Sequence, residues 1–242
     1  MPFLSCWFVP FNAPVAIEKF RFILVLASAV GASACTTGSS AIFTAAQGAI
    51  SSSQAKVIAA PLDPRFRYLR LTAFGQTVYP VLGFVDGNVD VWYSSSGEVI
   101  RLRNGRVSET AGLPTDWRDV VAPNAPQWSG LATQPTGYQR SRDVLPGYHF
   151  ALVDDVKVRT IDVPSTTALV GVAPSKLQWF EEVSITNDDR LALPVARFGV
   201  DMSATPPKVV YSEQCLSNTL CLQMQEWSAA QQSALHEKAI KP

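Results

Sequence analysis

Three glycine-containing turns, spaced about ten residues apart, constrain the fold of this chain more than any other feature. They are Asp86-Gly87-Asn88, Ser94-Ser95-Ser96-Gly97 and Asn104-Gly105, and alternating apolar and polar residues lie between them. Glycine and Asx residues tolerate the positive φ of tight turns, and Asn-Gly is the strongest two-residue hairpin signal. Turns this close together leave no room for helical crossovers, so residues 65–113 are predicted to form four antiparallel strands.

The strands of this meander differ in their expected burial. Residues 68–73 alternate strictly, as expected for a strand with one buried face. Residues 78–85 are apolar at both odd and even positions, which predicts that both faces of this strand are buried. Pro80 favours a sheet edge or a bulge there, because proline cannot donate a hydrogen bond to a ladder.

The rest of the chain continues as strands after an interruption. Residues 113–137 lose their periodicity and are predicted to form a long connection, held to the domain by burial of Trp117 and Trp128. Bends are expected at Asp154-Asp155 and Asn187-Asp188-Asp189. The expected strands are 138–145, 148–153, 156–163, 167–172, 177–185, 194–200, 208–212 and 220–227.

The fold class follows from this count. The sequence predicts an all-β domain over residues 65–227, an antiparallel meander that closes into a barrel-like sheet of about eleven strands, because closure removes exposed edges. Seventeen prolines in 242 residues disfavour long helices. Short helices are expected at residues 41–50 and in a tail over 228–242, where Ser228 would cap the helix.

The charge balance excludes one class of partner. Lys19, Arg21 and Glu18 are the charged residues of positions 1–34, so 18 basic and 19 acidic residues remain beyond them. Nucleic-acid binding normally requires a basic face, so no nucleic acid is expected.

The N-terminus has the pattern of a secretion signal over residues 1–34. Lys19 and Arg21 precede an apolar run at 22–31 and the small-residue cleavage site at 32–34. Met1 and the residues up to 17 precede any normal signal, which suggests a start codon assigned too early.

Cys35 follows the cleavage site in a pattern that resembles a bacterial lipobox, in which it would be diacylated and become the new N-terminus. Ala32 stands where lipoboxes usually carry leucine, and ordinary cleavage would instead release a soluble periplasmic protein. Thr36 is not aspartate, so the expected destination is the periplasmic face of the outer membrane. Residues 35–64 would then be the lipidated tether.

Two further cysteines, Cys215 and Cys221, bracket a short turn. In an exported protein this arrangement favours a disulfide over a metal pair. A metal site would need more histidine or cysteine than the two histidines of the chain provide, so no metal is expected.

Catalytic patterns are weak. A triad on His149 could recruit Asp143, Asp154 or Asp155, but no nucleophile elbow is found, and a strand histidine bonded to a carbonyl explains His149 better. The carboxylate pairs 154–155, 181–182 and 188–189 are each adjacent in sequence, which favours turns and solvated edges over a glycosidase cleft. No phosphate loop or dinucleotide motif is found, so no catalytic residue and no cofactor are expected.

The abundance of aromatic residues is the one feature of the composition that suggests a ligand, since aromatic rings can stack on sugars. Core packing explains each of them individually as well. The candidates for glycan stacking are Trp92, Tyr93, Trp117, Trp128 and Tyr148.

Several segments taken together carry a family resemblance over about residues 68–227. They are Tyr68-Leu69-Arg70-Leu71, Val81-Leu82-Gly83-Phe84, Asp86-Gly87 through Trp92, Gly97-Glu98-Val99-Ile100 to Asn104-Gly105-Arg106, Gly112-Leu113-Pro114, Pro146-Gly147-Tyr148 and Phe198-Gly199-Val200-Asp201. In these the chain resembles the YjbF/GfcB family of outer-membrane lipoproteins associated with group 4 capsule and exopolysaccharide clusters. The chain departs from the pattern at Cys215, which replaces an expected tryptophan.

The resemblance implies a β-barrel-like domain tethered by acyl chains on Cys35, with polysaccharide or polysaccharide-export proteins as partners. It carries no catalytic residues. We therefore expect a non-enzymatic lipoprotein that assists polysaccharide export. Two alternatives remain open: a periplasmic glycan-modifying hydrolase that uses His149, Asp154 or Glu181, and an envelope-assembly module that binds another protein.

Overall fold

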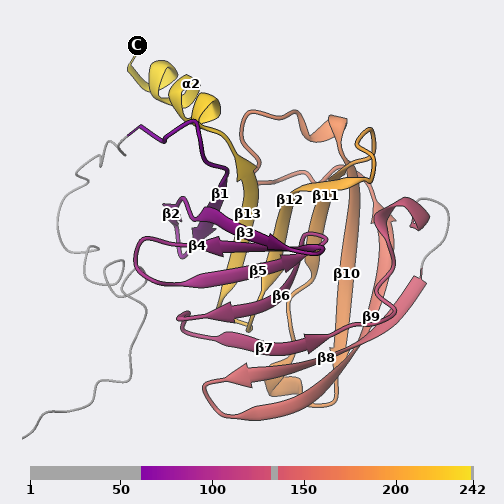
Figure 1. Cartoon of the computed structure of the whole chain (residues 1–242). Coiled ribbons are helices and arrows are strands. Elements are labelled where there is room, and N and C mark those ends of the chain that lie inside the picture. The colour runs from indigo at the N-terminus through magenta and orange to yellow at the C-terminus, as the bar shows by residue number, and fades with distance from the viewer. Residues whose placement is uncertain (1–60, 132–135, 241–242) are drawn as a thin grey trace, which may run out of the picture. The chain divides into compact units, whose positions relative to one another are not determined.

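The computed structural model describes residues 61–131 and 136–240, and its strands form one antiparallel sheet (Figure 1). The strands are β1 (Tyr68–Ala73), β2 (Gln76–Val78), β3 (Val81–Asp86), β4 (Val89–Tyr93), β5 (Val99–Arg103), β6 (Arg106–Ala111), β7 (Asp116–Val121), β8 (Thr136–Leu145), β9 (His149–Ile161), β10 (Gln178–Thr186), β11 (Ala196–Asp201), β12 (Lys208–Cys215) and β13 (Cys221–Trp227). Short 3-10 helices lie at η2 (Trp128–Gly130), η3 (Pro174–Lys176) and η4 (Asp189–Leu191), and one α-helix, α2 (Ala229–Ile240), follows β13.

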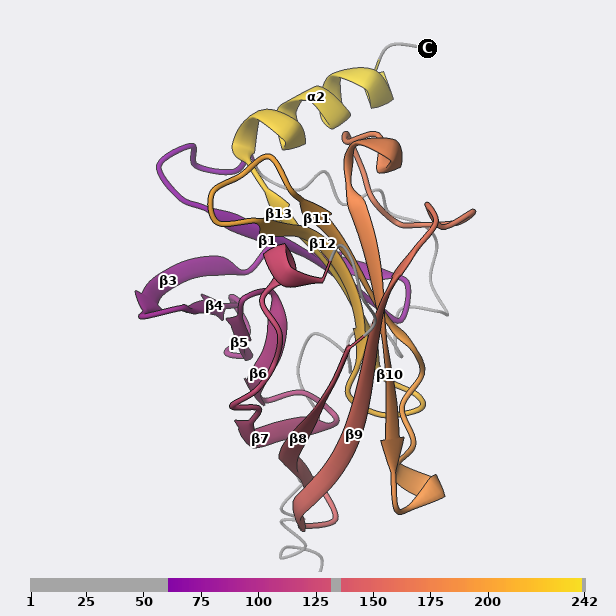
Figure 2. The ribbon, with the colours of Figure 1, turned by 90° about the vertical axis from the view of Figure 1, so that its right-hand side faces the viewer.

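The sheet is nearly closed into a barrel. Its strand order is β6-β5-β4-β3-β1-β13-β12-β11-β10-β9-β8-β7, and β2 pairs with β1. The two ends of this order, β6 and β7, follow one another in the chain, so the sheet curves back on itself (Figures 1 and 2). The prediction of an all-β, antiparallel, barrel-like fold is confirmed, with thirteen strands in place of about eleven.

Side chains, not a backbone ladder, join β6 to β7 in the described chain. The Thr110 hydroxyl donates to Asp116 Oδ1 at 2.9 Å and accepts from the Trp117 backbone N–H at 3.0 Å. Arg118 Nη1 on β7 lies 2.8 Å from Glu109 Oε1 on β6. Thr110 is 1% exposed, so its hydroxyl satisfies a buried backbone donor that a ladder would otherwise satisfy.

The β5–β6 hairpin turns at Asn104-Gly105, as the sequence predicted. Both residues have positive φ, 50° and 80°, which is the geometry of a type I′ turn. A Cβ on Gly105 would lie 2.4 Å from Val209 Cγ2, so the tip of the hairpin packs closely on β12. The Gln214 side chain fastens it there, because Oε1 accepts from Val107 N at 2.9 Å and Nε2 donates to the Gly105 carbonyl at 2.8 Å.

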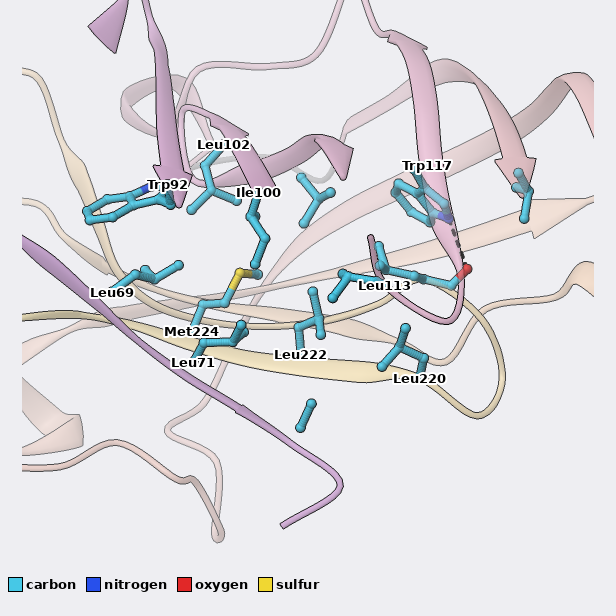
Figure 3. Packing of buried hydrophobic residues seen from close by; sticks show 14 residues of the cluster. Leu69, Leu71, Trp92, Ile100, Leu102, Leu113, Trp117, Leu220, Leu222 and Met224 are labelled. Carbon is cyan, nitrogen blue, oxygen red and sulfur yellow. Dashed lines mark hydrogen bonds between the residues drawn. The ribbon is translucent and has the colours of Figure 1, made fainter. Parts of the chain in front are cut away.

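The largest buried cluster lies between the β3–β7 part of the sheet and β1 and β13 (Figure 3). It includes Trp92, Ile100, Leu71 and Met224. Trp117 extends the cluster to the β12–β13 turn, where its Nε1 donates to the Leu216 carbonyl at 2.9 Å. A second cluster, around Trp128, Phe180 and Phe198, fills the space beside β8 to β11.

Several sequence predictions about strand positions are wrong. Residues 65–113 form six strands, β1 to β6, in place of four, and β9 is one strand in place of the two predicted at 148–153 and 156–163. Residues 113–137 were predicted to be a connection, yet β7 lies within them, while the predicted burial of Trp117 and Trp128 is confirmed. Residues 167–172 form no strand. Their backbone is bound by side chains instead: Ala168 N donates to the Tyr211 hydroxyl at 3.1 Å, and Val170 N donates to Gln225 Oε1 at 3.0 Å.

The predicted two-sided burial of residues 78–85 is also wrong. The segment is broken at Pro80 into β2 and β3, and Phe84 and Val85 are 47% and 51% exposed. Pro80 lies between the two strands, where a sheet edge or a bulge had been predicted, because proline cannot donate a hydrogen bond to a ladder.

The C-terminal helix begins as predicted at Ser228. The Ser228 hydroxyl accepts from Gln231 N at 3.2 Å, and the Gln231 side chain accepts from Ser228 N at 2.9 Å, which together form a capping box. Within the described residues, no helix is long and apolar enough to span a membrane. The expected helix at 41–50 lies outside the described residues.

Candidate functional site

The five aromatic residues considered for glycan stacking separate into two groups. Trp92, Trp117 and Trp128 are 1%, 3% and 3% exposed, so for these three the stacking prediction is wrong, because a sugar needs an open ring face. Tyr93 and Tyr148 are 41% and 73% exposed and remain candidates.

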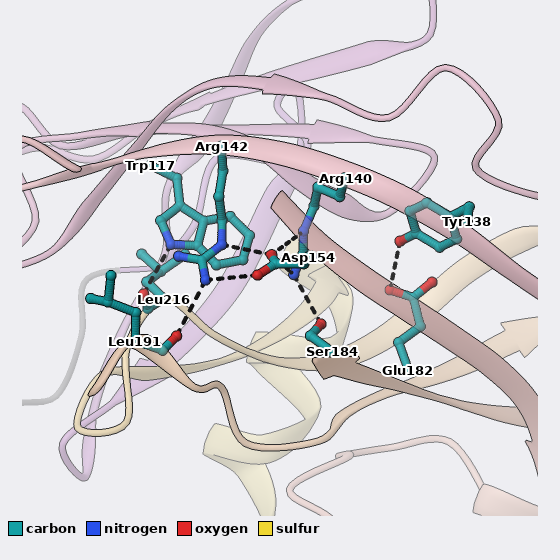
Figure 4. Close-up of polar contacts among 9 residues, drawn as sticks. All are labelled: Trp117, Tyr138, Arg140, Arg142, Asp154, Glu182, Ser184, Leu191 and Leu216. Carbon is teal, nitrogen blue, oxygen red and sulfur yellow. Dashed lines mark hydrogen bonds and ion pairs between the residues drawn. The ribbon is translucent and has the colours of Figure 1, made fainter. Parts of the chain in front are cut away.

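Asp154 lies at the centre of a buried charge cluster (Figure 4). The predicted bend at Asp154-Asp155 is wrong, because β9 runs straight through it and alternation continues: Asp154 is fully buried and Asp155 is exposed. Arg140 Nη2, on β8, lies 2.7 Å from Asp154 Oδ2 and also donates to Ser184 Oγ at 3.0 Å. Arg142 binds both oxygens of the same carboxylate.

Glu182 forms a second buried ion pair. It is 3% exposed, so the assignment of the Glu181-Glu182 pair to a turn or solvated edge is wrong for this residue. Arg106 Nε lies 2.7 Å from Glu182 Oε1, and the Tyr138 hydroxyl donates to Glu182 Oε2 at 3.0 Å. Burial and the nearby Glu182 charge raise the pKa of Tyr138 far above its ordinary value, so this residue stays a neutral donor.

Tryptophan rings support the guanidinium groups. The Arg140 and Arg142 Cζ atoms lie 4.7 and 4.9 Å from the Trp117 ring centroid, and Arg106 Cζ lies 3.9 Å from that of Trp128. Cation–π attraction and shape together hold these side chains in place. The buried tryptophans therefore position arginines.

A cleft of about 400 Å³ opens beside Arg106. We call it the arginine cleft. Its polar lining includes Arg103, Arg106, Arg140, Tyr138, Asn104 and Gln127, and one wall is formed by the mainly aliphatic residues 120–123 and 125. The volume lies within the range of about 300–1,000 Å³ that is usual for small-molecule sites.

A second hollow, of about 510 Å³, shares Asn88 and Asn104 with the arginine cleft. It contains Asp90, Lys208 and Glu226, so its charges are mixed. Burial, followed by repulsion from Glu226, raises the pKa of Asp90, although Arg67 and Lys208 oppose this shift. This hollow lacks the excess of positive charge that distinguishes the arginine cleft.

The other residues considered from the sequence do not converge on one site with the arginines. Cys35 lies outside the described residues. Cys215 and Cys221 face each other across β12 and β13, with their sulfurs bonded at 2.00 Å. His149 begins β9, whereas Glu181 pairs with Arg159 and Asp188 with Arg190 at the surface. Among the residues that the structure describes, no group of three or more His, Cys, Asp or Glu side chains is arranged to hold a metal.

Sequence reasoning missed the arginines. Every second side chain of β8 is buried, and these are Tyr138, Arg140, Arg142 and Val144. The two arginines therefore occupy core positions between an aromatic and an aliphatic residue. Charged residues at core positions signal buried pairs or a site. Arg106 has no such local signal, because it follows a turn.

Comparisons with known proteins agree with this architecture. A family model described as the group 4 capsule polysaccharide lipoprotein gfcB, YjbF, matches residues 39–217. The crystal structure of the hypothetical lipoprotein YmcC from Escherichia coli (K12) superposes with a TM-score of 0.57 at 18% identity, covering 72% of this chain and 94% of the other. That likeness shows the fold alone. No curated protein sequence matches the chain.

Proposed function

The chain belongs to the YjbF/GfcB family of group 4 capsule polysaccharide lipoproteins, and from this membership we propose that it assists the export or assembly of capsular polysaccharide or exopolysaccharide. It would do so without catalysis, by binding glycan or the export machinery. The observation that carries the proposal is the family match over residues 39–217, which includes β1 to β12 and every residue that lines the arginine cleft.

The proposed location is the periplasmic face of the outer membrane. Cys35 follows a signal with a small-residue cleavage site, and Thr36 is not the aspartate associated with retention at the inner membrane. Acylation of Cys35 would add more than one chain, and stable anchoring needs at least two. A soluble periplasmic protein is the alternative if ordinary signal peptidase acts.

The placement of the carboxylates supports a binding role over hydrolysis. A hydrolase needs an acid or base whose proton is free to move. Asp154 is instead bound by two guanidinium groups, and Glu181 is paired with Arg159. Both carboxylates are therefore engaged in ion pairs within the sheet.

An exposed aromatic hairpin supports contact with a protein of the export machinery. Tyr148 and Phe150, next to the β8–β9 turn, are 73% and 66% exposed, and their ring centroids lie 6.3 Å apart. Aromatic side chains are enriched at protein interfaces relative to the rest of the surface. This feature favours the envelope-assembly alternative as a second role.

The test compares surface and secreted polysaccharide, by amount and chain length, in four strains. They are the parent, a deletion strain, the deletion restored with the wild-type gene, and the deletion restored with Cys35→Ala. We expect polysaccharide to be lost on deletion, recovered with the wild-type gene, and not recovered with Cys35→Ala at matched protein levels. Unchanged polysaccharide in every strain would contradict an export role.

A further inference from the structure

We propose that the arginine cleft binds the carboxylate of an acidic sugar, a uronic acid unit within a polysaccharide. This inference rests on the proposed glycan-handling function and goes further, because it names the class of glycan and the residues that select it.

The first support is an imbalance of buried charge. Arg106, Arg140 and Arg142 lie in the interior opposite two carboxylates, Asp154 and Glu182. One positive charge in this group therefore has no counter-ion within it. An uncompensated buried charge is unfavourable, so a ligand anion that reaches the cleft would relieve a cost already present in the unliganded protein.

The second support is an unused hydrogen-bond donor. Arg106 Nη2 is buried and has no acceptor among the residues that the structure describes, while Nε of the same side chain is occupied by Glu182. A buried donor without an acceptor is rare and costly. Arg103 is the outer arginine of the cleft, exposed at the rim, where its Nη1 donates to Asn88 Oδ1 at 2.8 Å.

The inner arginine of the cleft, Arg106, is held in a fixed orientation. Trp128 lies against the Arg106 guanidinium, and Glu182 fixes its Nε. Arginine presents donors in a rigid fork that matches the two oxygens of a carboxylate. A preorganised fork loses less conformational entropy when it binds, which favours specific recognition over diffuse attraction.

The remaining lining suits a sugar ring. Asn104 and Gln127 supply amide groups that both donate and accept, as sugar hydroxyls require. Val120, Val121 and Pro123 supply an apolar wall for the C–H face of a pyranose. An acidic group on an otherwise hydroxylated ring matches the combination of arginines, amides and aliphatic wall.

The experiment titrates the purified full-length lipoprotein, in detergent, with trigalacturonic acid and with its methyl ester, using isothermal titration calorimetry. The ester keeps the rings and hydroxyls and removes the charge. We expect saturable binding of the acid, at least about tenfold weaker binding of the ester, and a loss of affinity for the acid as salt rises.

Matched variants locate the site. Arg103→Gln is expected to weaken binding of the acid about tenfold, whereas Arg159→Gln, an exposed arginine on β9 outside the cleft, is expected to change it less than about twofold. Both remove one positive charge, so the difference between them excludes long-range electrostatics. The double variant Arg106→Gln/Glu182→Gln tests the inner arginine without leaving Glu182 buried and unpaired.

Equal affinity for acid and ester would overturn the assignment of an acidic ligand, as would equal effects of Arg103→Gln and Arg159→Gln. Absence of saturable binding of the acid at millimolar concentration would overturn it too. These results leave the polysaccharide assay of the four strains untouched. Loss of polysaccharide in the deletion strain together with failed uronate binding would reject the ligand class and keep the export function.

Discussion

Arg142 and Asp154 form a two-pronged ion pair inside the sheet. Arg142 Nε lies 2.7 Å from Asp154 Oδ2, Nη2 lies 3.0 Å from Oδ1, and the side chains are 1% and 0% exposed. Arg140 Nη2 approaches the same Oδ2 at 2.7 Å, so one carboxylate neutralises part of two guanidinium charges. Desolvation makes such a group costly to bury, but breaking it costs more, because the remaining charges stay buried.

Asp154→Asn is therefore expected to destabilise the protein by about 3–5 kcal/mol. The asparagine keeps the shape and leaves two arginines without an anion. Urea unfolding followed by tryptophan fluorescence gives the free energy of unfolding. The control is Asp155→Asn, the exposed neighbour, which should change stability by less than about 0.5 kcal/mol. Equal effects of the two variants would show that the buried cluster contributes nothing specific.

Thr110→Val is expected to destabilise the β6–β7 junction by about 1–3 kcal/mol. Valine has nearly the same shape but leaves the buried Trp117 N–H without its acceptor, and Asp116 without one of its donors. Amide hydrogen exchange should show faster exchange in β6 and β7 than in β11 and β12. Thr136→Val, at an exposed strand position, is the matched control. Uniform acceleration across all strands would contradict a local role.

Gly105→Ala is expected to cost more than Gly87→Ala. Both glycines have positive φ, which costs alanine about 1–2 kcal/mol. A Cβ on Gly105 would additionally meet Val209, whereas nothing lies within 4 Å of one on Gly87. Adding Val209→Gly to Gly105→Ala removes the Val209 Cβ at 2.5 Å as well as both methyl groups, so in urea unfolding the double variant should lose less stability than the sum of the two single losses. If the second substitution only adds to the loss, the contact between hairpin tip and β12 is not the cause.

Asp90 is expected to make the folded protein less stable as pH rises, the opposite of the usual effect of a carboxylate. Burial raises its pKa in the folded state above the ordinary 3.8. Its favourable contribution is therefore complete below pH 3.8 and is lost as pH rises through the raised pKa. Asp90→Asn should therefore be more stable than wild type near neutral pH, with the difference vanishing in acid. Asp188, whose pKa is lowered by hydrogen bonds from Arg190, gives a control of opposite sign. A constant difference across pH would reject the assignment.

The pairing of Cys215 with Cys221 is expected to contribute about 2 kcal/mol, the amount for closure of a short loop. The double variant Cys215→Ser/Cys221→Ser should unfold at lower urea concentration than the oxidised wild type. A reductant should lower the wild-type midpoint to that of the variant and leave the variant unchanged. A wild-type midpoint that does not respond to reductant would contradict the contribution.

Most of the fold could be predicted because its signals are local. The Asn104-Gly105 turn and the alternation of residues 68–73 each reflect neighbours in sequence, and both were located correctly. Errors arose where tertiary contacts decide the structure. β7 was missed because prolines lie on both sides of it in the sequence, and because side chains, not a backbone ladder, connect it to β6. Residues 167–172 were wrongly predicted to form a strand. Their backbone N–H groups donate to the side chains of Tyr211 and Gln225, and no local sequence pattern reveals these contacts.

The candidate site was largely hidden for the same reason. Tryptophan was correctly singled out, but as a ligand-facing group, whereas Trp117 and Trp128 are buried against arginines. The bend assigned to Asp154-Asp155 assumed that two carboxylates in a row are solvated. The compensating arginine lies directly opposite in the neighbouring strand, a relation that depends on the register of β8 and β9.

The pairing of β1 with β13 also determines how the domain responds to mechanical tension. Tyr68 begins β1 and lies opposite Trp227 at the end of β13, so the chain enters and leaves the sheet at the same end of this ladder. In a protein held to a membrane by residues ahead of Tyr68, a pull on the domain reaches that end first. A pull that separates Tyr68 from Trp227 would load the rungs from Tyr68–Trp227 to Thr72–Gln223 one after another, and opening a ladder in this way needs less force than shearing it as a whole.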